Sequence, residues 1–70
     1  MPVPPPSLDL YRRVRAGFIV QGTTLKAWCR DRGTHIQNAR SALIGTWDGP
    51  AGRRLRSSIV KAARISGDLS

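Results

Sequence analysis

The four side chains of this chain that are best suited to recognition chemistry fall within residues 37–41; they are Gln37, Asn38, Arg40 and Ser41. The amides of Gln37 and Asn38 can donate and accept hydrogen bonds at once, which matches the edge of adenine, and Arg40 can bind guanine or a phosphate. His35 precedes them and is expected close to a phosphate. These residue types predict contacts with nucleic acid; the competing interpretation is a polar face that contacts only water.

Such side chains act together only if a helix presents them on one face, and residues 23–45 predict two short helices joined by a tight turn. Thr24, or Thr23, can cap the first helix by accepting a backbone N–H bond. The helix is expected to end at Arg32, because Gly33 can take the left-handed conformation that ends helices at little cost. The apolar face of this helix is predicted to consist of Leu25, Trp28 and Cys29.

The second helix of the pair is expected from about Ile36 to Ile44, and Gly45 closes it. Either Thr34 or His35 opens it. Its inward positions are predicted to be Ile36, Ala39, Ala42 and Leu43. The polar recognition residues then point outward. A helix–turn–helix whose second helix is polar on its free face is typical of domains that read DNA in the major groove.

A further helix is expected on each side of this pair. The one before it covers residues 8–20 with Ser7 as its cap, and the one after it begins at Asp48 or Gly49 with Pro50 in its first turn. Trp47, in the connection to the later helix, is expected to cover the core. The buried stripe of the earlier helix is predicted to be Leu10, Tyr11, Val14 and Phe18. That of the later helix is predicted to be Leu55, Ile59, Val60 and Ala63.

The predicted fold class is therefore all-α, with four to five short helices, because no stretch alternates β-branched and polar residues as a strand does. The helix–turn–helix domain is expected to span residues 7–66. Residues 1–6 carry four prolines and are expected to form a flexible arm, and residues 67–70 a short tail.

A strong excess of positive charge points to a polyanionic partner. Lys and Arg number 12 against 4 Asp and Glu, a formal net charge of +8. Arg53, Arg54 and Arg56 cluster at the start of the last helix and are expected to touch a DNA backbone or to contact only water. Thr24 and Lys26, at the start of the second helix, are further candidate DNA contacts. A weaker basic patch is formed by Arg12, Arg13 and Arg15.

Composition argues against catalysis and against a bound cofactor. One Cys and one His cannot form an internal disulfide or a zinc site of three or four ligands from one chain. Neither Cys29 nor His35 has an evident partner for nucleophilic or acid–base work, so no enzyme activity is expected. Without a ligand domain, no small-molecule ligand is expected. No secretory signal and no membrane span are recognised, so a cytoplasmic location is expected.

Residues 24–45, followed by the segment TWDGPAGRRLRSSIVKAARI, resemble small phage regulators of the Ner type, within the lambda-repressor-like class. The resemblance covers about residues 7–65, and it rests on Trp28, Cys29, Gly33, Ala39, Ala42, Leu43, Trp47, Gly49, Pro50 and Ile59. It implies a lambda-repressor-like domain that regulates transcription in a phage or mobile element, on the bacterial nucleoid. Because a single small module reads few base pairs, a homodimer on an inverted repeat of double-stranded DNA is expected, and a monomer or a dimer formed on the DNA are the alternatives.

Three other functions remain open at this point. An excisionase or architectural factor would use the same contacts but bend the DNA. A protein-interaction module would bind an acidic partner in place of nucleic acid. RNA binding is the third, although the aromatic-rich sheet of common RNA readers is not predicted.

Overall fold

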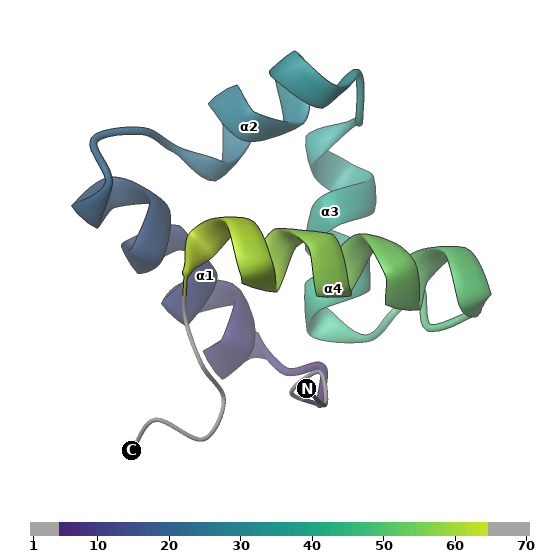
Figure 1. Ribbon diagram of the computed structural model, residues 1–70. Coiled ribbons are helices and arrows are strands. Elements are labelled where there is room, and N and C mark those ends of the chain that lie inside the picture. Colours follow the sequence, from purple (N-terminus) through teal and green to yellow (C-terminus); the bar gives the residue numbers. More distant parts are fainter. Residues whose placement is uncertain (1–4, 65–70) are drawn as a thin grey trace.

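The structure is a computed structural model in which residues 5–64 are described, and within that range every regular element is a helix. The four helices are α1 (Leu8–Val20), α2 (Leu25–Arg32), α3 (Ile36–Ile44) and α4 (Pro50–Ala63) (Figure 1). The predicted all-α class is confirmed. The predicted tail 67–70, residues 1–4 of the predicted arm and the last residues of the predicted domain lie outside the described range.

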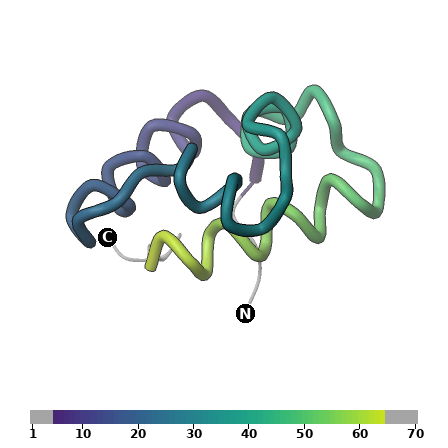
Figure 2. Tube along the Cα trace, turned by 90° about the horizontal axis from the view of Figure 1, so that it is seen from above, coloured from purple at the N-terminus to yellow at the C-terminus, as the bar shows by residue number. Residues whose placement is uncertain are grey.

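Helix α3 is the central element of the fold, since it packs against all three other helices. Helix α4 crosses it, and α1 packs on both α3 and α4. Figure 2 looks nearly along α3 and shows α1 and α4 on different sides of it. Helix α2 covers one end of this arrangement and contacts α1 and α3 (Figure 1).

The helix starts and ends follow local signals in the sequence. The Ser7 hydroxyl accepts the Leu10 N–H at 3.0 Å, and the Thr24 hydroxyl accepts the Ala27 N–H at 3.1 Å. Gly33 ends α2 with φ +70°, in the left-handed region, as predicted. Capping bonds of this kind satisfy N–H groups that the helix itself leaves free. Because the caps set the helix limits locally, the predicted and observed bounds agree within about one residue.

The core is formed where the apolar faces of all four helices meet. Its buried members are Leu10, Val14, Phe18, Leu25, Cys29, Ala39, Leu43, Ile59, Val60 and Ala63. Tyr11, Trp28 and Leu55 are only partly buried at the margin of this cluster. The ring of Trp28 lies 6.2 Å from that of Phe18 and is covered by the guanidinium of Arg32 at 5.0 Å.

Ile36 does not belong to the core, so its predicted inward position is wrong. It is 36% exposed and lies at the start of α3, beside a hollow bounded by α1 and α2. Trp47 is likewise 37% exposed in the connection to α4 and does not cover the core as a lid would.

The prediction that Arg56 lies on an exposed or DNA-facing side of α4 is also wrong. Its side chain is buried, on the same side of the helix as Ile59 and Ala63. The Nη1 group donates to the Ala42 carbonyl at 3.2 Å and to the Asp48 carboxylate at 2.9 Å. Because Ala42 lies in the last turn of α3 and Asp48 precedes α4, Arg56 links the two helices through the connection between them.

The contact between Gly52 and Trp47 predicts a destabilising substitution. A Cβ at Gly52 would overlap the backbone carbonyl group of Trp47, which cannot move away as a flexible side chain could. We expect Gly52→Ala to lower the free energy of unfolding by roughly 1–3 kcal/mol, despite the better helix propensity of alanine. The control is Gly49→Ser at the start of α4, which has no side-chain cap. A Cβ added to Gly49 would meet no atom within 4 Å beyond its chain neighbours. This substitution should raise stability by a few tenths of a kcal/mol. Urea unfolding that shows equal stability for Gly52→Ala and wild type would contradict the packing.

Asp48 predicts a specific loss of stability in acid. The hydrogen bond from Arg56 holds the pKa of its carboxyl group below the ordinary value of 3.8. The unfolded chain therefore binds this proton first, and the free energy of unfolding falls as the pH drops from about 4 through the lowered pKa. We expect Asp48→Asn to be less stable at neutral pH and to lose less stability between about pH 4 and pH 2. Thermal melting of both proteins across that range measures the difference; parallel curves would show that the pair has no role.

Candidate nucleic-acid interface

The exposed face of α3 presents the residues that the sequence singled out. Gln37, Arg40, Ser41 and Ile44 follow the i, i+3, i+4, i+7 spacing of one helix face, opposite the buried Ala39, Ala42 and Leu43. Asn38 is exposed at the edge of this face. With Thr46, these residues line a shallow hollow of about 550 Å³. Its lining contains no acidic side chain, so the hollow offers hydrogen-bond donors and acceptors together with one cation.

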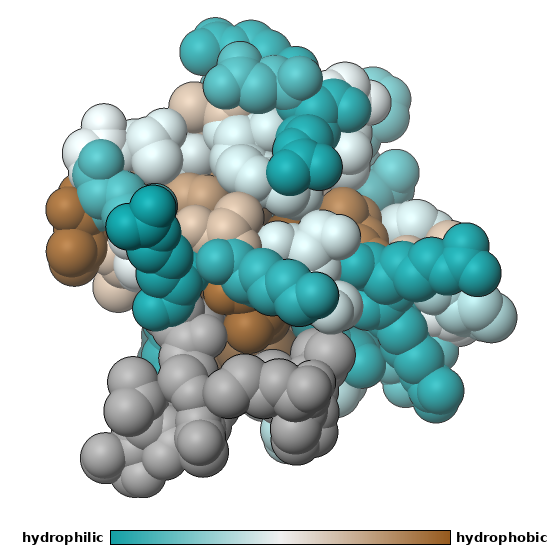
Figure 3. Space-filling view, in the orientation of Figure 1, coloured by the Kyte–Doolittle hydropathy of each residue, from teal (hydrophilic) through white to brown (hydrophobic). Residues whose placement is uncertain are grey.

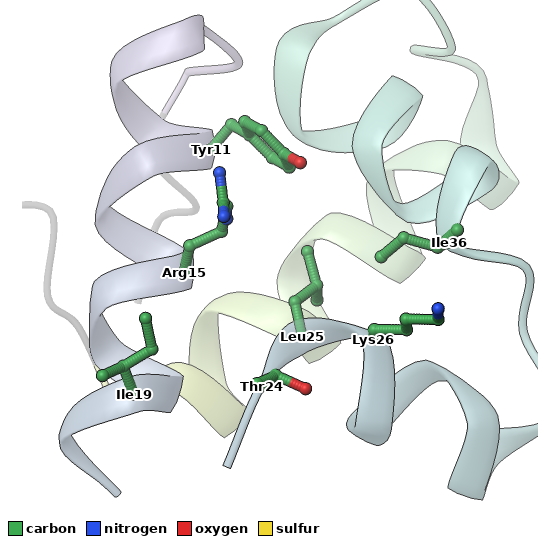
Figure 4. Close-up of a pocket in the computed structure, with 7 residues that line it drawn as sticks. All are labelled: Tyr11, Arg15, Ile19, Thr24, Leu25, Lys26 and Ile36. Carbon is green, nitrogen blue, oxygen red and sulfur yellow. The ribbon is translucent and has the colours of Figure 1, made fainter. Parts of the chain in front are cut away.

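A second hollow, of about 380 Å³, lies between α1 and the starts of α2 and α3 (Figure 4). Its lining residues are Tyr11, Arg15, Ile19, Thr24, Leu25, Lys26 and Ile36. Arg15 extends from α1 beside Tyr11, and Lys26 extends from α2 beside Ile36 (Figure 4). Two cations thus flank a largely apolar depression that has no acidic residue in its lining.

Tyr11 connects the two hollows. The guanidinium of Arg15 lies 5.6 Å from the centre of its ring, and that of Arg40 lies 5.8 Å from it. Cation–π contacts of this kind contribute about 0.5–1 kcal/mol at exposed sites, which is enough to bias where the two cations lie. The result is one basic surface that runs from α1 across to the exposed face of α3.

The start of α2 adds a partial positive charge to the same surface. Thr24 caps this helix, Lys26 is in its first turn, and the first turn holds no acidic residue. The first backbone N–H groups of a helix have no partner inside it and favour anions. Thr24 and Lys26 therefore sit where a phosphate would be stabilised.

The start of α3 is open to an external acceptor in a similar way. His35, the exposed N-cap of this helix, makes no capping hydrogen bond with its side chain, and the first turn has no acidic residue. Gln37 and Asn38 are exposed there. N–H groups without a partner at a helix start keep their partial positive charge and their capacity to bind an oxygen. An anion at this end of α3 would therefore meet backbone donors and exposed amides together.

Tyr11 was predicted only as a buried residue. The sequence also did not indicate which of the three arginines of α1 would lie beside the candidate interface. Arg15 lines the second hollow, whereas Arg13 forms an exposed ion pair with Asp9 at 3.1 Å. A usable signal was present in the sequence: Tyr11 and Arg15 are four residues apart and so share a helix face. Only the packing of the helices shows that this face lies beside α3.

The structure does not bring Arg54 to the exposed face of α3. Arg54 lies on the side of α4 opposite its buried residues, and α4 packs against the buried side of α3. The two exposed faces therefore point away from each other. Figure 3, viewed from the α4 side, shows hydrophilic side chains extending over this helix. Arg53 lies 3.6 Å from Asp48 with its side chain 68% exposed.

Cys29 is buried in the core, and this burial raises the pKa of its thiol. A thiol with a raised pKa stays protonated and is a poor nucleophile. Among the residues that the structure describes, no three His, Cys, Asp or Glu side chains are grouped so that they could hold a metal ion. None of the helices in this range is long and apolar enough to cross a membrane.

Comparisons with protein-family models, with curated protein sequences and with solved structures find no match for this chain. The resemblance to Ner-type regulators therefore stays a prediction.

Proposed function

We propose that this protein is a sequence-specific regulator that binds double-stranded DNA and reads the major groove with α3. The observation that carries the proposal is the exposed face of α3, where Gln37, Arg40 and Ser41 have no acidic neighbours in the hollow and border a basic surface. An α-helix with its side chains is about 10–12 Å wide, which fits the major groove of B-DNA. The resemblance in the sequence adds the setting, a phage or mobile element.

The contacts divide into two kinds with different consequences. Gln37, Ser41 and Asn38 carry the groups that hydrogen-bond base edges, and these contacts set the sequence preference. Thr24, Lys26 and the first turn of α2 hold a backbone phosphate, which positions the domain without reading sequence. In this arrangement the domain regulates by occupying a promoter or by recruiting a partner there.

A single module of this size reads few base pairs, so its affinity for one half-site is limited. Binding of two copies to an inverted repeat raises both affinity and specificity. With a formal net charge of +8 on each chain, two free copies repel each other, and the phosphates of DNA remove that repulsion. A dimer that forms on the DNA is therefore the assembly we propose.

One observation favours a second function, the binding of an acidic protein segment. The second hollow has an apolar lining that includes Leu25 and Ile19, which is 63% exposed, between the cations Arg15 and Lys26. An acidic segment with a bulky apolar side chain would match this pattern. A salt titration with duplex DNA distinguishes the two functions. Binding that weakens steeply as the salt concentration rises favours the DNA-binding function.

The first test of the proposed function concerns base reading. We expect Gln37→Ala to weaken binding to a selected duplex by roughly 1–3 kcal/mol and to change binding to random duplex little, because the variant cannot form the amide–adenine pair. Fluorescence anisotropy on both duplexes measures the two effects. Ser58→Ala, on the exposed part of α4, serves as the control and should change neither. An equal weakening on both duplexes would assign Gln37 to the phosphates.

A second test concerns the position of the basic surface. The double variant Arg15→Gln with Lys26→Gln should reduce the slope of log affinity against log salt by about two, because each phosphate that the protein no longer neutralises lowers it by about one unit. The matched control, Arg54→Gln with Lys61→Gln, removes the same charge from the exposed side of α4 and should leave the slope nearly unchanged. Equal slopes for the two double variants would show that only net charge matters, and this would contradict the proposed interface.

A further inference from the structure

Ile44 is an apolar residue on the otherwise polar exposed face of α3. It is partly buried, yet it belongs neither to the core cluster nor to the hydrophobic residues packed against that cluster. Its neighbours in the first hollow are polar, among them Ser41 and Thr46. Core packing alone therefore does not account for an isoleucine at this position.

The spacing between Ile44 and Gln37 has a simple relation to the repeat of DNA. Seven residues separate them on one helix face, which corresponds to roughly 10 Å along the helix axis. Consecutive base pairs are about 3.4 Å apart, so the two side chains are separated by about three base-pair steps. A helix lying along the groove would present them to different base pairs of one half-site.

Only one base offers an apolar group in the major groove of ordinary DNA, and that group is the C5 methyl of thymine. The other edges present hydrogen-bond donors and acceptors that isoleucine cannot satisfy. Burying a base-edge donor or acceptor against isoleucine without a hydrogen-bond partner costs free energy. Isoleucine therefore disfavours the other bases as well as favouring thymine.

We propose that Ile44 contacts a thymine methyl group about three base pairs from an adenine bound by Gln37, so that each half-site carries an A·T pair at both positions. This inference rests on the proposed function, since it names the bases that the same surface reads. Arg40, between the two positions along the helix, leans toward Tyr11 and is placed for a phosphate.

The experiment replaces one methyl group and nothing else. Duplexes selected from a random pool by the full-length protein identify the half-site, and each thymine in it is then replaced singly by deoxyuridine. We expect one replacement to weaken binding about fourfold, the effect of removing one buried methyl or methylene group. The affected position should lie about three base pairs from an adenine whose recognition is abolished in Gln37→Ala.

Ile44→Ala completes the test. It should bind the thymine duplex more weakly and should no longer distinguish thymine from deoxyuridine at that position. Val20→Ala, at an exposed position of α1 outside both hollows, is the control and should keep the wild-type difference. If no deoxyuridine replacement weakens wild-type binding, or if Ile44→Ala keeps the full difference, the inference is overturned while DNA binding stands. If no duplex is selected at all, the proposed function itself fails.

Discussion

The rest of the structure depends on how the carboxyl end of α3 is satisfied. The last carbonyls of a helix have no partner inside it, and burying them unpaired costs free energy. The Ser41 carbonyl accepts the Trp47 N–H at 3.1 Å, that of Leu43 accepts the Ser7 N–H at 2.9 Å, and that of Ala42 accepts the Arg56 guanidinium. One helix end thus ties the start of α1, the α3–α4 connection and α4 together. Helix α3 is fixed in orientation at this end, and its first turn is open to an external acceptor at the other end.

The helices could be predicted from the sequence because their limits are set locally. Ser7, Thr24 and Gly33 act through bonds or dihedral angles within a few residues, so no knowledge of the packing is needed. The outward direction of the polar residues of α3 followed from helix periodicity in the same way. Arg56 could not be placed by its charge, which favours exposure. Its burial depends on an acceptor in α3, fourteen residues earlier, and on Asp48.

The candidate site shows the same division between local and distant information. Lys26 and Arg40 could be named from the sequence. Tyr11 connects the hollows in which they lie, and this connection depends on how α1 packs on α3. Arg54 was placed with them by its charge and its position near a helix start, and the packing of α4 puts it elsewhere. Sequence patterns therefore identify which residues can bind a phosphate or a base, and the tertiary arrangement decides which of them can act on one ligand.

The basic surface also bears on the free energy of the molecule without a ligand. Arg15 and Arg40 approach the same tyrosine ring, and two like charges on one surface repel each other. The ring offsets part of this repulsion through its π electrons, but water and salt must screen the remainder. A polyanion placed over Tyr11 would supply the missing negative charge directly. Under the proposed function, this repulsion would be relieved when a phosphate binds, as electrostatic complementarity requires.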